Sequence, residues 1–204
     1  MAKFEIVKKY ENEGLTLPVR ATAKSAGYDF AVAEEVTIPP LERHQKVLKQ
    51  EYSFTFYFLD EIKDMVKPYE AKPTLVPTGI KCKMADDEYL EISVRSSLPL
   101  KHWLILGNGV GIIDSDYYNN PDNEGEIFFQ LINLSPFPIR LNKGDKIGQG
   151  IIKKYIVTED DAASGDRTGG FGSTSQNWGE HRMYNILALD QASRTSGYAI
   201  FRDG

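Results

Sequence analysis

Cysteine is almost absent from the sequence, and its scarcity excludes two kinds of structure. The 204 residues include one cysteine, Cys82. A single cysteine cannot close a disulfide within the chain, and it cannot supply the several thiolates of a cysteine-built zinc site. The residues around it, 79–84, are typical of a strand, so we expect a buried structural thiol there and not a reactive one.

The sequence also lacks an excess of basic residues and any long apolar run. It contains 24 lysines and arginines against 29 aspartates and glutamates, a formal net charge of −5. Binding of long nucleic acids through counterion release requires a basic face, so we expect no nucleic-acid partner. No apolar run approaches the ~20 residues that span a membrane, and residues 1–5 do not begin a signal peptide. We therefore expect a soluble, cytoplasmic protein without a membrane partner.

The usual motifs of hydrolases are missing as well. The sequence has neither a Walker-type phosphate-binding motif nor the HExxH motif of zinc proteases. Its three histidines, His44, His102 and His181, lie without the spacing of metal ligands or of a catalytic triad. Hydrolysis by this chain would therefore depend on carboxylates, a metal ion and backbone donors.

Short apolar segments separated by glycine, proline and asparagine predict strands along most of the chain. The predicted strands are 4–10, 35–38, 52–58, 74–84, 89–95, 103–106, 126–133, 137–141 and 147–156. Only 58–67 is typical of a helix, because its apolar residues recur at helical spacing and Pro68 ends the run. Many short strands with frequent turns indicate an all-β fold of the barrel or jelly-roll type.

Three segments differ in composition from this β pattern. Residues 43–72, which contain the predicted helix, are expected to be an insertion into a β core that spans 1–158. Residues 159–176 are polar and rich in glycine, serine and aspartate, which is typical of a mobile arm. Residues 177–204 form an additional tail, whose part from 183 to 201 is again apolar and strand-like.

Five short motifs contain most of the residues that could support a reaction. They are SAGYD at 25–29, RSSL at 95–98, GNGVGIIDSDY at 107–117, KGDKIGQ at 143–149 and RTGGFGST at 167–174. In these motifs and their order, residues 15–176 resemble the trimeric dUTPase family, in particular its bacteriophage and Gram-positive members. The resemblance implies a distorted jelly-roll β fold and a homotrimer with shared active sites. It also implies Mg²⁺-dependent hydrolysis of dUTP to dUMP and pyrophosphate, which keeps uracil out of DNA and supplies dUMP for dTMP synthesis.

The resemblance implies roles for two carboxylates. Asp114 matches the residue that orients and deprotonates the water attacking the α-phosphorus. Asp29 matches a residue that helps to hold Mg²⁺ through coordinated water, which suits a hard cation that dehydrates reluctantly. The metal would neutralise the triphosphate and align the α-phosphorus for in-line attack.

Two further motifs are expected to bind the phosphates of dUTP. Arg95, Ser96 and Ser97 supply a guanidinium, hydroxyls and turn N–H groups, which together suit an anion. Gln149 matches a glutamine of the family that also donates toward phosphate.

The third motif is expected to recognise the nucleoside. A hairpin around 108–113 would bind uracil largely through backbone groups and would exclude thymine and cytosine. The residues expected to form this uracil site are Asn108, Gly111, Ile112 and Ile113. Tyr117 would pack beneath the deoxyribose and leave no room for a 2′-hydroxyl.

The arm supplies the last group of substrate-binding residues. They are Arg167, Phe171, Gly172, Ser173 and Thr174. Phe171 can stack on the base and Arg167 can bind the γ-phosphate, while the hydroxyls add donors. In the family this arm closes over an active site built by other subunits, so each site is expected to need all three chains.

The chain departs from the family pattern at two points. A single residue, Thr168, separates Arg167 from the following glycine pair, where the family often has two residues, so Arg167 is expected to reach the γ-phosphate from a shifted position. Residues 118–124 lengthen the turn after Tyr117. We expect this longer turn to change the tip of the loop and not the pocket.

Two other functions are compatible with the sequence. A dCTP deaminase, or a bifunctional deaminase–dUTPase, shares the fold, although the complete arm and the block 114–117 favour a plain dUTPase. Alternatively, the chain is a regulatory protein that binds a repressor through the insertion 43–72, as some phage dUTPases act on repressor proteins.

The tail resembles a different family. Residues 183–204 are similar to the first hairpin of RNase H-like Holliday-junction resolvases, in which the residue matching Asp190 binds catalytic metal. Only this hairpin is present, so nuclease activity is not expected. The tail is interpreted either as translation into a neighbouring gene or as a packed C-terminal hairpin.

Overall fold

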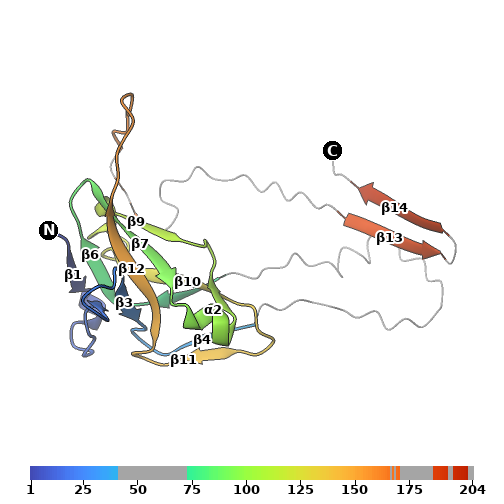
Figure 1. Ribbon diagram of the computed structural model, residues 1–204, viewed down its shortest axis with the longest axis horizontal. Coiled ribbons are helices and arrows are strands. Elements are labelled where there is room, and N and C mark those ends of the chain that lie inside the picture. Colours follow the sequence, from blue (N-terminus) through green and yellow to red (C-terminus); the bar gives the residue numbers. More distant parts are fainter. Residues whose placement is uncertain (41–72, 166, 168, 171–185, 193–194, 202–204) are drawn as a thin grey trace. The chain divides into compact units, whose positions relative to one another are not determined.

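A computed structural model describes residues 1–40, 73–165, 167, 169–170, 186–192 and 195–201 (Figure 1). The chain divides into two units, residues 1–171 and 172–204. The first unit contains all the described parts of the five motifs, and the second contains the tail.

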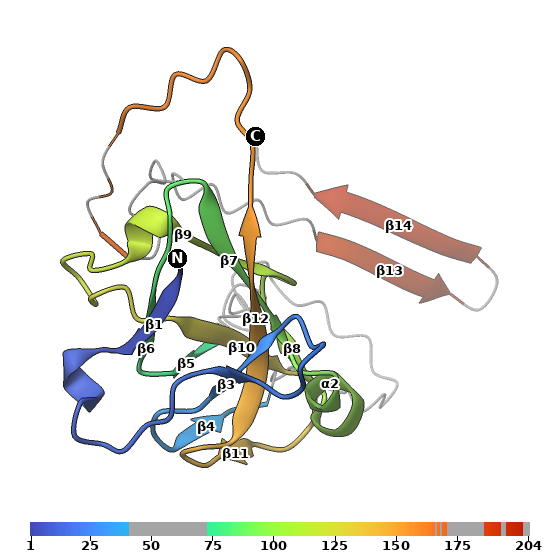
Figure 2. The ribbon, with the colours of Figure 1, turned by 60° about the vertical axis from the view of Figure 1, so that its left-hand side comes forward.

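The first unit is built almost entirely from strands, so the predicted all-β class is confirmed (Figures 1 and 2). Its strands are β1 Lys3–Ile6, β2 Val19–Arg20, β3 Tyr28–Ala31, β4 Val36–Ile38, β5 Thr74–Pro77, β6 Ile80–Lys83, β7 Glu88–Val94, β8 Leu104–Leu106, β9 Gly111–Asp114, β10 Phe128–Asn133, β11 Ile139–Leu141 and β12 Lys146–Lys154. Its short helices are η1 Lys8–Tyr10, α2 Ser97–His102 and η2 Ser115–Tyr117.

The strands form small sheets around one large one. The largest sheet has five strands in the order β2-β3-β12-β7-β9, and a three-stranded sheet has the order β5-β10-β8. Two further pairs are β1-β6 and β11-β4. The long strand β12 lies at the centre of the large sheet and leads at its C-terminal end into the arm (Figure 2).

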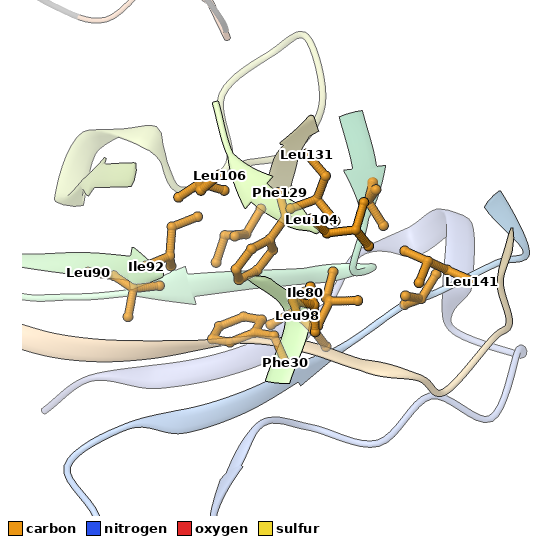
Figure 3. Packing of buried hydrophobic residues seen from close by; sticks show 14 of the residues in the cluster. Phe30, Ile80, Leu90, Ile92, Leu98, Leu104, Leu106, Phe129, Leu131 and Leu141 are labelled. Atoms are coloured by element: carbon orange, nitrogen blue, oxygen red, sulfur yellow. The ribbon is translucent and has the colours of Figure 1, made fainter. Parts of the chain in front are cut away.

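The core lies between the large sheet and the three-stranded sheet (Figure 3). Phe30 of β3 and Phe129 of β10 are both fully buried, and their ring centroids lie 5.8 Å apart. Gly148 of β12 allows this packing, because a Cβ atom there would lie 1.9 Å from the Phe129 ring. The predicted structural thiol is confirmed: Cys82 is 3% exposed, and burial raises the pKa of its thiol to about 12.

Several strand predictions differ from the structure in detail. The segment predicted as one strand over 74–84 is broken into β5 and β6 at Gly79, which adopts a φ of +67°. The expected hairpin around 108–113 is wrong, because β8 pairs with β10 while β9 pairs with β7. Residues 107–110 therefore form a turn between two sheets. The predicted strand 52–58 and helix 58–67 lie outside the described residues.

The second unit contains two strands that pair with each other. They are β13 Ile186–Ala192 and β14 Thr195–Phe201, which are antiparallel with Ile186 opposite Phe201. The strand-like character predicted for this part of the tail is confirmed. Within the described parts of both units, no helix combines the length and hydropathy that crossing a membrane requires.

The close approach of Gly148 to Phe129 leads to a stability prediction. Gly148→Ala should lower the free energy of unfolding by about 2 to 3 kcal/mol, because the added methyl group overpacks a close-packed core. Gly165→Ala is the control, since a Cβ atom there meets nothing within 4 Å. Urea unfolding at one fixed protein concentration would compare them, and equal stability of the two variants would contradict the described packing.

Candidate active site

The first part of the candidate site is a row of side chains across the large sheet. Asp29 of β3 lies opposite Gln149 of β12, and Gln149 lies opposite Ser93 of β7. The antiparallel ladder thus brings together the first and fourth motifs, although 120 positions separate their key residues in the sequence. Gly27 allows Gln149 to lie against the first motif, because a Cβ atom there would be 2.7 Å from Gln149 Oε1.

Two cations lie beside Asp29. Its side chain is 10% exposed, with Oδ2 3.0 Å from Lys146 Nζ and Oδ1 3.8 Å from Arg95 Nε. Arg95 directly follows β7, and its backbone N–H donates to the carbonyl of Ile147. Two positive charges around one carboxylate leave a net positive charge, which suits an anionic ligand.

The second motif continues from Arg95 into a short helix. Ser96 precedes α2 and Ser97 begins it, while the N–H of Leu98 donates to the carbonyl of Arg95. Ser96 is exposed and Ser97 is partly buried. The two serines therefore directly follow Arg95 in the sequence, and Ser96 is the more accessible of the two. We call Asp29, Arg95, Ser96, Ser97, Lys146 and Gln149 the phosphate half.

The other part of the site lies on β9 and the helix that follows it. Asp114 is the last residue of β9, and its side chain is 55% exposed. Tyr117 is 7% exposed, and its hydroxyl donates to the carbonyl of Glu126 at 3.0 Å. Burial, first of several causes, raises the pKa of Tyr117. We call Asp114, Asp116 and Tyr117 the base half.

The turn expected to recognise uracil leads directly into the base half. Asn108 is exposed on this turn, and Ile112 is 53% exposed on β9. Gly111 is buried, and a Cβ atom there would lie 2.6 Å from the side chain of Ile92. Ile113 is partly buried and packs against the core. Of these residues, Asn108 and Ile112 thus present the accessible surface.

The described part of the arm lies against the base half of its own chain. Arg167 Nη2 lies 2.6 Å from Asp114 Oδ2, and Arg167 Nε lies 2.7 Å from Asp116 Oδ1. The guanidinium is also 5.7 Å from the centre of the Tyr117 ring. The N–H of Gly170 donates to Asp122 Oδ2 at 2.7 Å. These contacts lie within one chain, and the expectation that the arm closes over a site built by other subunits stays a prediction.

The other residues expected in the arm lie outside the described residues; they are Phe171, Gly172, Ser173 and Thr174.

The phosphate half and the base half lie at opposite ends of β7. Asp114 is opposite Tyr89 at the beginning of this strand, and Arg95 follows Tyr89 by six residues. A strand rises about 3.3 Å per residue, so about 20 Å separates the two positions along the sheet. Within one chain, the structure does not bring Asp114 together with the residues expected to bind phosphate.

The lengthened turn after Tyr117 contacts the base half directly. Asn123 Nδ2 donates to the Tyr117 hydroxyl at 2.7 Å, and Asp122 accepts from Gly170 of the arm. The expectation that this turn leaves the pocket residues unaffected is therefore wrong. Sequence reasoning also missed Asp116 and Lys146, although both lie inside motifs that it had identified.

Comparison with known proteins identifies the family of the chain. A family model described as dUTPase matches residues 57–175. The deoxyuridine 5'-triphosphate nucleotidohydrolase of Lactococcus lactis is 40% identical over 173 residues, which cover 84% of this chain and 95% of that protein. The chain belongs to the dUTPase family. The prediction of a dUTP-hydrolysing enzyme, made from five short motifs, is confirmed by this membership.

Solved structures support the fold of this dUTPase. The crystal structure of the dUTPase from Streptococcus mutans is 36% identical, has a TM-score of 0.60, and covers 76% of this chain and 98% of that one. A second solved structure is a variant of the dUTPase from phage phi11 of Staphylococcus aureus, described with a structural Mg(II) ion. It is 15% identical with a TM-score of 0.54, and the match covers 81% of this chain and 97% of that chain. The second likeness supports the fold alone.

The tail of this dUTPase lies beyond the family match. The match ends at residue 175, before β13 and β14 begin. It therefore gives no support to the resemblance between the tail and a resolvase, which stays a prediction.

The contact between Gly27 and Gln149 can be tested by substitution. Gly27→Ala should lower kcat/KM for dUTP about tenfold, because the methyl group displaces the Gln149 amide and would remove the hydrogen bond that Gln149 is expected to donate to a charged phosphate. Stability should change little, since the flexible end of Gln149 can move aside. Gln149→Ala should have the same effect, and the double variant should lose no more. Additive losses in steady-state assays would contradict this coupling.

Proposed function

We propose that the dUTPase hydrolyses dUTP to dUMP and pyrophosphate at a site made by two copies of the chain. One copy contributes the phosphate half and its neighbour contributes the base half with the arm. The observation that carries this proposal is the distance of about 20 Å between Asp114 and Arg95 along β7. A base that far away cannot deprotonate a water attacking a phosphate held by Arg95, because proton transfer needs hydrogen-bond distance.

Asp114 is the general base of the proposed reaction. Its carboxylate accepts a proton from a water whose oxygen bonds to the α-phosphorus, and the bond between that phosphorus and the bridging oxygen breaks as pyrophosphate leaves. Its exposed side chain at the end of β9 supports this role. The γ-phosphate would compete with Asp114 for Arg167, because both anions bind a guanidinium.

The phosphate half holds the triphosphate and its metal. Arg95 and Gln149 donate to phosphate oxygens together with the hydroxyls of Ser96 and Ser97. Among the described residues, no group of three or more carboxylates, histidines or cysteines could hold a metal by itself. Mg²⁺ that arrives with a nucleotide needs only one or two carboxylates from the protein, and Asp29 fits this requirement. When bound, the metal would neutralise phosphate charge and align the α-phosphorus.

The base half recognises the nucleoside. Backbone groups of the turn and β9 would pair with the edge of uracil, with Asn108, Gly111, Ile112 and Ile113 forming the slot. The ring of Tyr117 would lie beneath the deoxyribose and exclude a 2′-hydroxyl. The burial of Tyr117 supports this role, because a fixed ring discriminates by shape better than a mobile one.

The arm completes the site from the same chain as the base half. Arg167 binds the γ-phosphate, Phe171 stacks on the base, and the segment of Gly172, Ser173 and Thr174 adds donors. The contacts of Arg167 and Gly170 with their own chain support this arrangement.

A shared site also implies an assembly of copies. The phosphate half and the base half are different surfaces, so each contact between copies is heterologous, and such contacts form a ring when the rotation between copies closes. The resemblance to trimeric dUTPases supports a ring of three. We also propose that the chain divides into a core of 1–158, an arm of 159–176 and a tail of 177–204. Residues 43–72 are proposed to bind a protein partner, and the proposed location is the cytoplasm.

The role of Asp114 can be tested by removing its charge. Asp114→Asn should lower kcat about 10²- to 10⁴-fold, the contribution typical of a general base, because the amide keeps the shape and cannot take the proton. Binding of an imido analogue of dUTP, measured by calorimetry, should persist. Asp86→Asn is a control on an exposed turn of the same unit. Turnover of Asp114→Asn like that of the control would rule out Asp114 as the base.

A further inference from the structure

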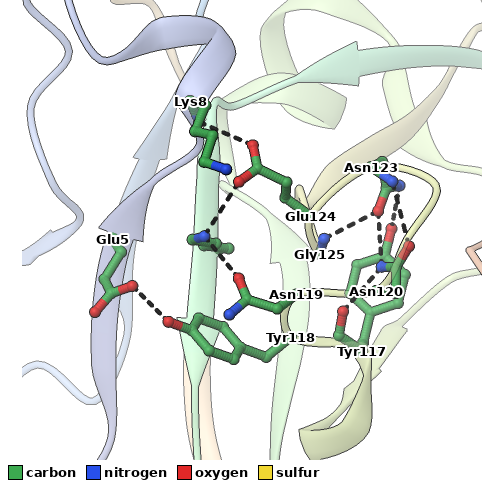
Figure 4. A network of polar contacts seen from close by, with 10 residues as sticks. Glu5, Lys8, Tyr117, Tyr118, Asn119, Asn120, Asn123, Glu124 and Gly125 are labelled. Atoms are coloured by element: carbon green, nitrogen blue, oxygen red, sulfur yellow. Dashed lines mark hydrogen bonds and ion pairs between the residues drawn. The ribbon is translucent and has the colours of Figure 1, made fainter.

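The hydroxyl of Tyr117 is held by two hydrogen-bond partners, one within the lengthened turn and one just after it. It donates to the carbonyl of Glu126 at 3.0 Å. It also accepts from Asn123 Nδ2 at 2.7 Å (Figure 4). A phenolic hydroxyl has one donor and can accept as well, so both capacities are used. The position of the ring therefore depends on the side chain of Asn123 and on the backbone of Glu126, which lies just before β10.

Asn123 is itself fixed by a network of amide groups. Its Oδ1 accepts from Asn120 Nδ2 at 2.8 Å and from the N–H of Gly125 at 3.0 Å. Asn120 is buried, and its Nδ2 also donates to the carbonyl of Tyr117. With Oδ1 occupied in this way, the amide nitrogen of Asn123 is directed at the tyrosine hydroxyl.

The turn that carries Asn123 is fastened to the neighbouring strands. Lys81 of β6 donates to Asn119 Oδ1 at 2.7 Å and pairs with Glu124 at 3.5 Å. The hydroxyl of Tyr118 donates to Glu5 of β1 at 2.6 Å (Figure 4). These contacts hold both ends of the turn, so Asn123 is a fixed support and not the side chain of a loose loop.

We propose that Asn123 is a positioning residue that sets the discrimination between dUTP and UTP through the hydroxyl of Tyr117. The proposal rests on the role of Tyr117 beneath the deoxyribose. A ring held at both sides of its hydroxyl cannot move away to admit a 2′-hydroxyl. Loss of the Asn123 bond removes one of the two described hydrogen bonds that hold the hydroxyl, and the less firmly held ring can then tilt to accommodate a ribose.

A double-mutant cycle tests this route of action. The measured quantity is the ratio of kcat/KM for dUTP to kcat/KM for UTP in the full-length protein. Asn123→Ala should lower the ratio about fivefold, the factor that corresponds to one net hydrogen bond. Tyr117→Phe, which removes both described hydrogen bonds of the hydroxyl, should lower it at least as much. The double variant should lower it no further than Tyr117→Phe alone, because Asn123 then has no hydroxyl to hold. Additive effects, or an unchanged ratio in Asn123→Ala, would overturn the proposal.

Three further variants distinguish a failure of the inference about Asn123 from a failure of the proposed role of Tyr117. Asn123→Asp retains the oxygen that accepts from Asn120 and Gly125, and its second oxygen can accept from the Tyr117 hydroxyl, so its ratio should lie closer to that of the wild type than the ratio of Asn123→Ala. Tyr118→Phe removes one turn contact that does not involve Tyr117 and should leave the ratio unchanged. Tyr117→Ala tests the sugar role itself. If it leaves the ratio unchanged, the proposed function of Tyr117 fails, whereas a changed ratio in Tyr117→Ala with an unchanged ratio in Asn123→Ala refutes only the inference about Asn123.

Discussion

The length of β7 is the constraint on which the rest of the site depends. This strand pairs with β12 on one side and with β9 on the other. The first pairing places Gln149 near Arg95, and β12 also pairs with β3, which adds Asp29 to this group. The second pairing fixes Asp114 at the far end of β7. Backbone ladders of this kind cannot slip by one residue without turning every side chain to the opposite face. The separation of the two halves is therefore a property of the folded sheet, and in the proposed site the halves meet through assembly of copies.

The distribution of charge agrees with this division. The phosphate half contains two cations around one carboxylate, whereas the base half contains two carboxylates that share the cation of Arg167. The positive charge of the phosphate half is thus suited to binding phosphates, whereas the base half contains carboxylates that can accept a proton. The lengthened turn contacts both the ring of the base half and the arm, because Asn123 donates to the Tyr117 hydroxyl while Asp122 accepts from Gly170. In the proposed function, this single polar turn therefore supports both elements that surround the nucleoside.

Sequence reasoning identified the strand-rich fold because the periodicity of short strands is local. Strand pairing is not local, which is why the turn at 107–110 was mistaken for a hairpin although its flanking strands belong to different sheets. The motifs identified the carboxylates and the arginine, but not their partners. Lys146 reaches Asp29 across 117 positions, and Asn123 reaches Tyr117 only because the turn folds back on itself. Such contacts follow from the register of the sheet and the geometry of a turn, neither of which a motif contains.

Recovery of activity in mixed assemblies tests the shared site most directly. Arg95→Ala disables the phosphate half and Asp114→Asn disables the base half, so each variant alone should be nearly inactive. If the two are refolded together in equal amounts, a site is intact when an intact phosphate half meets an intact base half from a neighbour. Random assembly gives about a quarter of such sites, so about a quarter of the wild-type turnover should return. No recovery, despite mixed assemblies demonstrated by mass spectrometry, would contradict a site built from two chains.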